Sequence, residues 1–324
     1  MSLVEHHHSR QRAGDGREDF ASLRRGGLDW DEFGLHLFVT GNARFWDPRG
    51  IDFSTDALDW REMRDDERRF VTYLVAQIWA GEEAVTRDVQ PFGQAAAADG
   101  RLGDEMYLSQ VAFEKAKHTE VFRLWMDAAG LVDDLNPVLD TNPFYRQLIV
   151  EELPAALRRM ETDPSPENQI RAVITFHQVI GGTLACTGHR MLQRICSAYG
   201  ILPGMRTLIR MISTDERRHM AWGTYTCRRL VAADDALADV AVTRMSELMP
   251  LALGMINWLD GEFAPLPFDL STAEFIAYAA DRSRRRLDAI GSARGLTVEQ
   301  VEYDHSPEAL EDVFGEEDSA ALGS

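Results

Sequence analysis

Two segments of the chain place a histidine three residues after a charged residue, which is the spacing of a helical metal-binding motif. In DERRH, Glu216 precedes His219 by three residues, whereas in FEKAKH the residue three positions before His118 is Lys115. Residues three apart lie on one face of a helix, so Glu-x-x-His sets a carboxylate beside an imidazole, as paired helices do when they bind metals. One motif is complete, and the other carries a lysine where a carboxylate is expected.

The size and charge of the chain limit its function. Its 324 residues, 45% of them hydrophobic, are enough to bury a sizeable core and suit one large domain. Lysine and arginine number 34 against 53 aspartates and glutamates, and the net charge of -19 repels nucleic-acid phosphate and anionic lipid. We therefore expect no nucleic-acid partner.

Cysteine usage and hydropathy indicate a cytoplasmic protein. Cys186, Cys196 and Cys227 have no CxxC or disulfide-framework spacing, and an odd count in a large chain favours reduced thiols. No apolar run approaches the roughly 18 residues that cross a bilayer, and the start lacks the apolar segment of a signal peptide. The sequence predicts no membrane span.

The two ends of the chain are expected to carry no chemistry. Three histidines at positions 6–8 lie in a polar start, so residues 1–26 are predicted to be a disordered tail. The main domain is predicted to span residues 27–312. Apolar residues after Glu308 indicate a short helix that frays into a tail, which we place at residues 313–324.

Apolar residues recur at helical spacing in four long stretches. Asp65 can cap the first stretch, Gly103 separates it from the second, and Gly130 ends the second. A further helix is expected after Asp235. The four long helices are predicted at residues 66–98, 104–129, 166–198 and 204–231.

The connections between these helices indicate how they pack. A short turn, a long crossover and another short turn join them in pairs, which is typical of a ferritin-like bundle. No alternating pattern typical of strands occurs. The predicted fold class is therefore all-α, with a ferritin-like four-helix bundle core and additional peripheral helices.

The inner faces of these helices carry an incomplete set of metal ligands. Dimetal bundles of this kind take four carboxylates and two imidazoles from their four helices. The first helix offers Glu82, the second His118, and the fourth Glu216 and His219. The third helix offers no glutamate and instead has the pair Gly181–Gly182 where a ligand is expected.

Several segments, taken in order, resemble one known family. They are GGLDWDEFGLHLFVTGNARFWDP, GEEAV, DEMYLSQVAFEKAKH, ILPGM and DERRHMAWGT. Together they closely resemble the ligand-binding oxidases related to the ribonucleotide reductase small subunit, over nearly the whole chain from about Gly27 to Asp312. The resemblance implies a manganese and iron pair, a long-chain fatty acid bound beside it, oxygen activation, and a tyrosine-to-valine ether cross-link.

The resemblance also implies roles for individual residues, and three of them depart from the family pattern. Lys115 and Gly181 each stand where the family has a glutamate, and Phe176 stands where it has the cross-linking tyrosine. Phe176 has no phenolic oxygen, so the ether bond should be absent. The implied metal positions are Glu82, Lys115, His118, Gly181, Glu216 and His219, and the implied cross-link positions are Val85 and Phe176.

Three states of the centre remain open from the sequence, and each gives Lys115 a different role. In the first, a single iron or manganese ion is held by Glu82, His118, Glu216 and His219. In the second, no metal binds, and the Lys115 ammonium takes its place between the carboxylates. In the third, Lys115 is neutral or carbamylated, and a carbamate restores a bridging carboxylate and a metal pair. Glu114 and His177 are further candidates as replacement ligands. Otherwise Glu114 is a hydrogen-bond partner of a ligand or lies on a solvated face, and His177 is a core histidine.

The function predicted from these residues is an oxidoreductase that activates molecular oxygen at a single-metal site. Its substrate is expected to be an apolar or carboxylate-bearing molecule, such as a fatty-acid-like ligand, in a pocket formed by Val85, Phe176, Gly181 and Gly182. Lys115 would act catalytically by orienting an anionic intermediate or donating a proton. The alternative is a metal-free protein, either a silent ligand binder or an enzyme that uses a modified side chain. A homodimer is expected for either.

Overall fold

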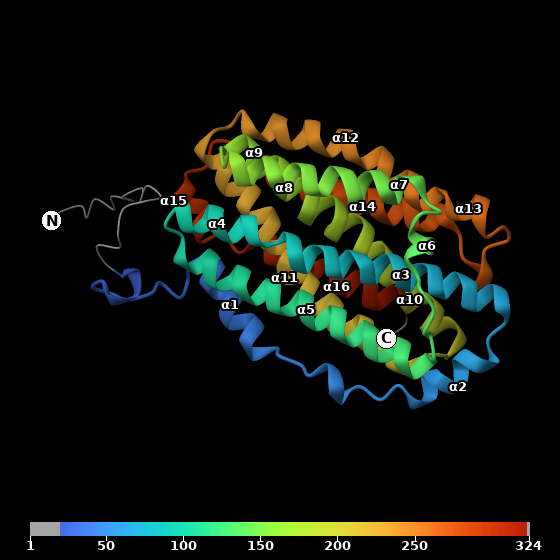
Figure 1. The fold of residues 1–324 in the computed structure, drawn as a ribbon. Coiled ribbons are helices and arrows are strands. Elements are labelled where there is room, and N and C mark those ends of the chain that lie inside the picture. Colours follow the sequence, from blue (N-terminus) through green and yellow to red (C-terminus); the bar gives the residue numbers. More distant parts are fainter. Residues whose placement is uncertain (1–19, 323–324) are drawn as a thin grey trace.

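The computed structural model describes residues 20–322, and all regular structure in that range is helical. Figure 1 shows long helices lying side by side, with shorter ones around them. The predicted all-α class is confirmed. The predicted N-terminal tail falls mostly on residues 1–19, which lie outside the described residues. Among residues 20–322, no helix is both long enough and apolar enough to cross a bilayer.

Four helical segments form the core bundle, close to where periodicity predicted them. The second and fourth are continuous helices, α5 (Leu102–Ala129) and α11 (Pro203–Ala233). Gly130 ends α5 in the left-handed conformation with φ 77°, which glycine adopts without strain. Pro203 begins α11 at a position where its missing N–H costs no hydrogen bond.

The first predicted helix, residues 66–98, is in fact two helices. They are α3 (Asp65–Asp88) and α4 (Gln90–Ala98), which meet at Val89. Pro91 lies in the first turn of α4 and has no N–H to donate to the preceding turn, so the α-helical ladder is interrupted there.

The third predicted helix, residues 166–198, begins and ends as expected but widens in the middle. It consists of α9 (Pro166–Val173), the π-helical segment η4 (Ile174–Ala185) and α10 (Cys186–Tyr199). Gly182 is needed here, because a Cβ on it would lie 2.6 Å from Nη1 of Arg286. Arg286 donates a hydrogen bond to the Gly182 carbonyl at 2.7 Å and pairs with Glu311.

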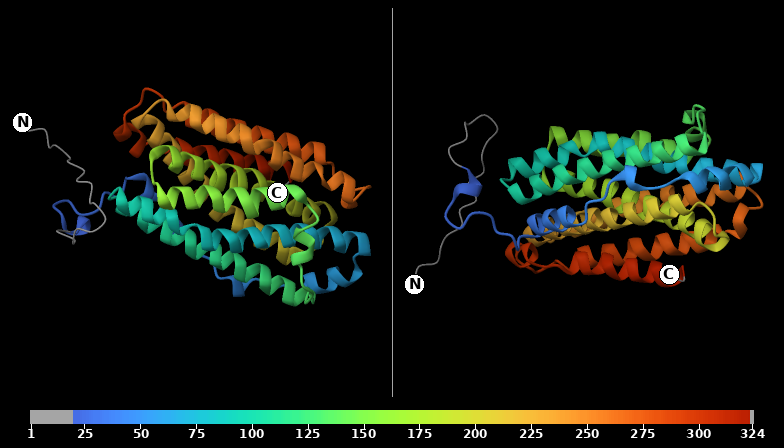
Figure 2. Two further views of the ribbon diagram at one scale, coloured as in Figure 1. Left: turned by 45° about the horizontal axis from the view of Figure 1, so that its top comes forward. Right: turned by 90° about the horizontal axis from the view of Figure 1, so that it is seen from below.

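Further helices cover the bundle, and Figure 2 shows them on its outside. The longer ones are α1 (Phe33–Ala43), α2 (Ser54–Glu62), α8 (Leu153–Thr162), α12 (Leu237–Asn257), α14 (Thr272–Gly291) and α16 (Ser306–Ala321). The shorter segments are α6 (Asn136–Leu139), α7 (Pro143–Tyr145), η3 (Arg146–Glu152), α13 (Leu259–Glu262), α15 (Val298–Glu302), η1 (Ala21–Leu23), η2 (Pro48–Gly50) and η5 (Pro267–Asp269).

The C-terminal tail that the sequence placed at residues 313–324 is helical as far as Ala321. Helix α16 packs on α11 and α14, and Asp318 accepts hydrogen bonds from Arg190 at 3.0 Å and from Arg282 at 3.1 Å. These ionic contacts with distant helices hold a segment whose own apolar content is low. Periodicity alone therefore does not reveal it.

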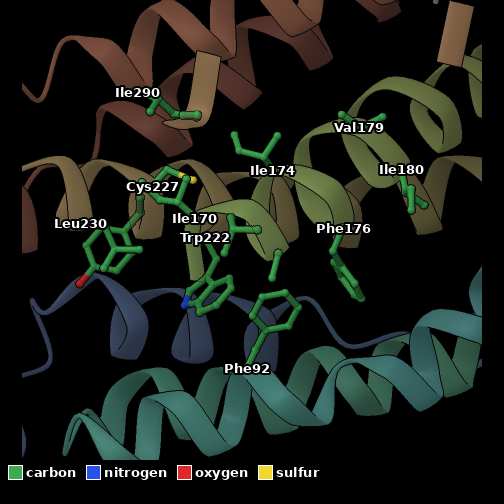
Figure 3. Packing of buried hydrophobic residues seen from close by; sticks show 14 of the residues in the cluster. Phe92, Ile170, Ile174, Phe176, Val179, Ile180, Trp222, Cys227, Leu230 and Ile290 are labelled. Atoms are coloured by element: carbon green, nitrogen blue, oxygen red, sulfur yellow. The ribbon is translucent and has the colours of Figure 1, made fainter. Parts of the chain in front are cut away.

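The buried apolar residues form two clusters, one toward each end of the bundle. One contains Val85, Val111 and Trp222, and the other contains Ile78, Val121 and Ile212. In Figure 3 the Phe92, Phe176 and Trp222 rings of the first cluster face one another, each from a different element. Most of the buried charged residues on α3, α5 and α11 lie between the two clusters, so a polar layer crosses the middle of the core.

His189 on α10 makes stability depend on pH. Burial lowers the pKa of His189 from 6.5 to about 4. Because the unfolded chain protonates this residue below its ordinary pKa and the folded protein does not, the free energy of unfolding falls as the pH drops from 6.5 to about 4. We expect His189 to account for about 3 kcal/mol of that loss.

Chemical denaturation near neutral pH and near pH 4 measures this effect in the wild type and in His189→Met. The variant should lose correspondingly less stability on acidification. An equal loss in both proteins would contradict the assignment.

Candidate functional site

The polar layer brings together the four residues predicted as metal ligands. Glu82 comes from α3, His118 from α5, and Glu216 and His219 from α11, and each is at most 2% exposed. Lys115 joins them from α5 and is also buried. The structure thus brings the four residues to one place, and their role as metal ligands stays a prediction.

Lys115 lies at the middle of this constellation. Its Nζ is 2.5 Å from Oε1 of Glu216, to which it donates a hydrogen bond, and 3.1 Å from Oε2 of Glu82. Burial alone would lower the pKa of Lys115, but the two carboxylates outweigh it and raise the pKa above its ordinary value. Lys115 is thus an ammonium that bridges two glutamates.

Both histidines turn one ring nitrogen inward and the other toward a carboxylate on the outer side. His118 Nδ1 lies 3.1 Å from Oε2 of Glu82, and its Nε2 lies 3.1 Å from Oδ2 of Asp215. His219 Nε2 lies 2.7 Å from Oε2 of Glu114. Burial lowers the pKa of His118, but Glu82 and Asp215 outweigh it and raise the pKa to about 9.

A second ring of charges surrounds the inner one. Arg218 donates hydrogen bonds to Glu114 at 2.5 Å and to Asp215 at 2.8 Å. Lys117 lies 3.0 Å from Asp215 and over the Trp46 ring, and the Trp46 indole donates to the same carboxylate at 2.9 Å. Glu114 thus orients His219 and does not point inward. Of the roles open to it from the sequence, it has that of a hydrogen-bond partner to a candidate ligand.

Sequence reasoning missed three members of this outer ring, Asp215, Lys117 and Trp46. Asp215 directly precedes Glu216, and Lys117 directly precedes His118, so both lie within the motifs already singled out. The signal available was the histidine itself, because a ring nitrogen that faces a ligand site commonly has a carboxylate on its other side. Trp46 lies in an extended stretch far away in sequence and gives no comparable signal.

The charges of the whole network nearly cancel without any added ion. Four carboxylates, those of Glu82, Glu114, Asp215 and Glu216, face three permanent cations, those of Lys115, Lys117 and Arg218. One negative charge is left over. A single proton on His118 or His219 balances it, because burial lowers the pKa of both residues but the neighbouring carboxylates outweigh burial and raise it.

His177 does not join the centre. Its ring packs among Phe92, Phe176 and Trp222, with centroid distances of 5.2, 4.5 and 5.0 Å. Burial holds the pKa of His177 well below its ordinary value, so it is a neutral core residue. His177 is therefore a core histidine and not a ligand of the centre. Neither of its ring nitrogens has a hydrogen-bond partner.

A narrow internal cavity of about 80 Å³ reaches the centre. Its inner end is formed by Glu82, Lys115, Glu216 and His219, and its wall is largely apolar. At this end Oε2 of Glu216 is buried without a hydrogen-bond partner, and Nδ1 of His219 lies 3.2 Å from the other oxygen of Glu216. The wall includes Tyr73, Leu74, Ile78, Gly81, Val85, Tyr145, Phe176, Ile180, Gly181, Met191, Met255 and Leu259.

Three of the four predicted pocket residues, Val85, Phe176 and Gly181, line this cavity. Gly182 does not line it, and its place in a substrate pocket stays a prediction. It faces Arg286 on α14 instead, because successive residues of a helix point to different sides.

Comparison with known proteins places the chain in a family. The family model for the ribonucleotide reductase small chain matches residues 35–291. The chain belongs to that family. An R2-like ligand-binding oxidase from Sulfolobus acidocaldarius is 34% identical, with a TM-score of 0.79, and the match covers 88% of this chain and 99% of that one. By this match the chain is also a member of the R2-like ligand-binding oxidases.

Two further solved structures of R2-like ligand-binding oxidase contain an aerobically reconstituted Mn/Fe cofactor. One, after a long soak, is 30% identical with a TM-score of 0.81. The other, in which a tyrosine is replaced by phenylalanine, is 31% identical with a TM-score of 0.79. Each match covers 85% of this chain and 98% of the other.

The residues of this family member do not fit a metal pair. Two carboxylates, Glu82 and Glu216, face the centre, whereas a dimetal bundle uses four. For one ion, Glu82, His118 and Glu216 each offer a ligand atom, all within 4.8 Å of one another. The Lys115 ammonium, however, contacts both carboxylates, and at about 4 Å it repels a divalent ion by on the order of 8 kcal/mol before compensation.

Proposed function

We propose that this member of the oxidase family binds one narrow, largely apolar ligand against a centre in which the Lys115 ammonium takes the place of the metal charge. The observation that carries the proposal is the contact of Lys115 Nζ with both Glu82 and Glu216. With one proton on His118 or His219, whose pKa values the carboxylates raise, the surrounding charges are balanced. This neutral, buried network needs no ion to offset its carboxylates.

The cavity supports an elongated ligand. Its wall follows α3 from Tyr73 to Val85, a span of about 18 Å at the rise of an α-helix. Apolar side chains form most of this wall, so a hydrocarbon chain gains free energy by leaving water. The polar end of the ligand would lie at Glu216, whose buried Oε2 has no hydrogen-bond partner.

The chemistry of Oε2 of Glu216 limits which head groups the ligand can have. Oε2 of Glu216 accepts hydrogen bonds only, since Lys115 and His219 hold the pKa of that carboxyl well below its usual value despite burial. A head group that donates a hydrogen bond satisfies it. The proposed ligand is therefore a long-chain alcohol, amine or protonated fatty acid.

A second candidate is the single-metal oxidase, in which one iron or manganese ion displaces Lys115. The specific observation in its favour is the set of three ligand atoms on Glu82, His118 and Glu216, together with the Mn/Fe cofactor of the relatives. A bound ion would supply activation of molecular oxygen. In this candidate His219 would complete the ligand set.

Elemental analysis of protein loaded with iron and manganese without oxygen separates the two candidates. The metal-free centre predicts less than about a tenth of an equivalent at this site, and the single-metal centre predicts about one equivalent. Because the three histidines at positions 6–8 and the group formed by His36, His305 and Glu308 can bind metal themselves, the protein used carries serine at positions 6–8 and His305→Ala. Pairing of two copies through the long helices stays a prediction for either candidate.

Blocking the cavity tests the ligand. Gly81 lines the cavity, and a Cβ on it meets nothing within 4 Å, so Gly81→Leu fills the channel without a backbone clash. We expect organic extracts of the purified wild type to contain a long-chain molecule by mass spectrometry, and those of Gly81→Leu to contain little.

Gly93→Leu is the matched control, because Gly93 is equally open but lies on α4 outside the cavity wall. Equal ligand content in all three proteins would exclude this cavity as the binding site. The result is independent of metal content, so it tests the ligand separately from the centre.

A further inference from the structure

A second group of metal-type side chains lies at the junction of α1 and α16, and the proposed function does not use it. His36 Nε2 lies 2.8 Å from Oε2 of Glu308, and His305 Nδ1 lies 3.8 Å from the same oxygen. Each of the three residues offers a ligand atom, and these atoms all lie within 4.8 Å of one another. We propose that His36, His305 and Glu308 bind one divalent transition-metal ion, with zinc as the best fit.

The donor set carries this assignment. Two imidazoles and one carboxylate are a common three-residue set for zinc, with water completing the tetrahedron. The three side chains are partly exposed, at 34%, 40% and 19%, so both the ion and its water can reach the site. Unlike the centre in the polar layer, this group has no lysine or arginine in contact with its ligand atoms among the described residues.

The surrounding structure holds the ligands in place before any ion binds. His305 packs against Phe33, whose ring stacks on Tyr225 with a centroid distance of 4.5 Å. His36 lies three residues after Phe33, on the same face of α1. Asp304, directly before His305, is paired with Arg228 and accepts a hydrogen bond from Ser306 at 2.9 Å. Preorganisation of this kind lowers the entropy lost on binding.

The ion would join two segments that are far apart in the chain. His36 and Glu308 are separated by 272 positions, and the proposed site links the first long helix to the last one. Helix α16 carries Glu311, the partner of the buried Arg286, so its position matters for the core. Zinc at this site should therefore stabilise the docking of α16 on the bundle.

Zinc titration of chelator-treated protein tests the proposal. The parent protein has serine at positions 6–8, which removes the competing histidines. In competition with a chromophoric chelator, we expect the parent to bind one equivalent of zinc, and His305→Ala and Glu308→Gln to bind it more than about tenfold more weakly. Glu299→Gln, a change of the same kind on the adjacent α15, should bind like the parent.

Hydrogen exchange gives a second readout. Zinc should slow amide exchange in residues 306–321 of the parent and leave that of His305→Ala unchanged. Circular dichroism in the presence of chelator establishes that the variants are folded. The proposal is overturned if the parent binds no zinc, or if both site variants bind it as tightly as the parent.

Discussion

Replacing Lys115 and Gly181 together by glutamate is expected to raise the metal content of the centre from none to about two ions per chain. The change removes the ammonium that contacts Glu82 and Glu216 and supplies the two carboxylates that a metal pair needs. The two histidines already turn a ring nitrogen toward the centre. Elemental analysis after anaerobic loading with iron and manganese measures the result.

The glutamate at position 181 needs room, and the structure shows how to provide it. A Cβ on Gly181 would lie 2.5 Å from Cε of Met220, the flexible end of a side chain. The double variant is therefore made both alone and with Met220→Ala. Lys115→Gln with Gly181→Gln is the matched control, since it has similar shape without the new charges, and it should bind no pair.

Two outcomes would contradict this interpretation. If the wild type already holds one ion in the polar layer, Lys115 does not replace the metal charge. If the double glutamate variant folds and still binds no metal, the lost carboxylates do not explain the difference from the Mn/Fe relatives.

Removing Lys115 without replacing its charge should cost the protein about 3–5 kcal/mol of unfolding free energy near neutral pH. Lys115→Met leaves two buried carboxylates close to each other without the ammonium between them. Chemical denaturation measures the loss. The matched control is Arg123→Met on the same helix, whose partner Asp127 is 61% exposed, and it should cost less than about 1 kcal/mol.

A double-mutant cycle isolates the interaction. When Glu216→Gln is added to Lys115→Met, part of the lost stability should return, because one of the unpaired carboxylates is gone. Losses that simply add would mean that Lys115 contributes by packing alone. In that case the Lys115–Glu216 contact would not explain the network.

The sequence predicted the bundle well because its main signals are local. Helical spacing of apolar residues needs only neighbouring positions, and the Glu-x-x-His spacing of Glu216 and His219 fixes a shared face without any knowledge of the fold. Glu82 and His118 could be assigned to the same site once the bundle topology was assumed. The resemblance to the oxidases supplied the expected positions of the missing carboxylates.

The parts that the sequence did not predict depend on contacts between distant segments. Asp215 acquires its role from Trp46, which lies 169 positions away. The π-helical turns of η4 widen the third helix, and the helical periodicity used for the prediction assumes that such turns are absent. Helix α16 is held by ion pairs with α10 and α14, and its acidic composition alone suggests a tail.

The polar layer between the two apolar clusters also constrains which substitutions this protein can accept. Each buried charge there has its partner on another helix, so a single substitution leaves a buried charge without its partner. Substitutions in this layer are therefore expected to preserve folding only in compensating sets. A carboxylate at position 115 alone would face Glu82 and Glu216 with no cation between them, so Lys115 and Gly181 can be exchanged for metal ligands only together and with the ions that those ligands bind.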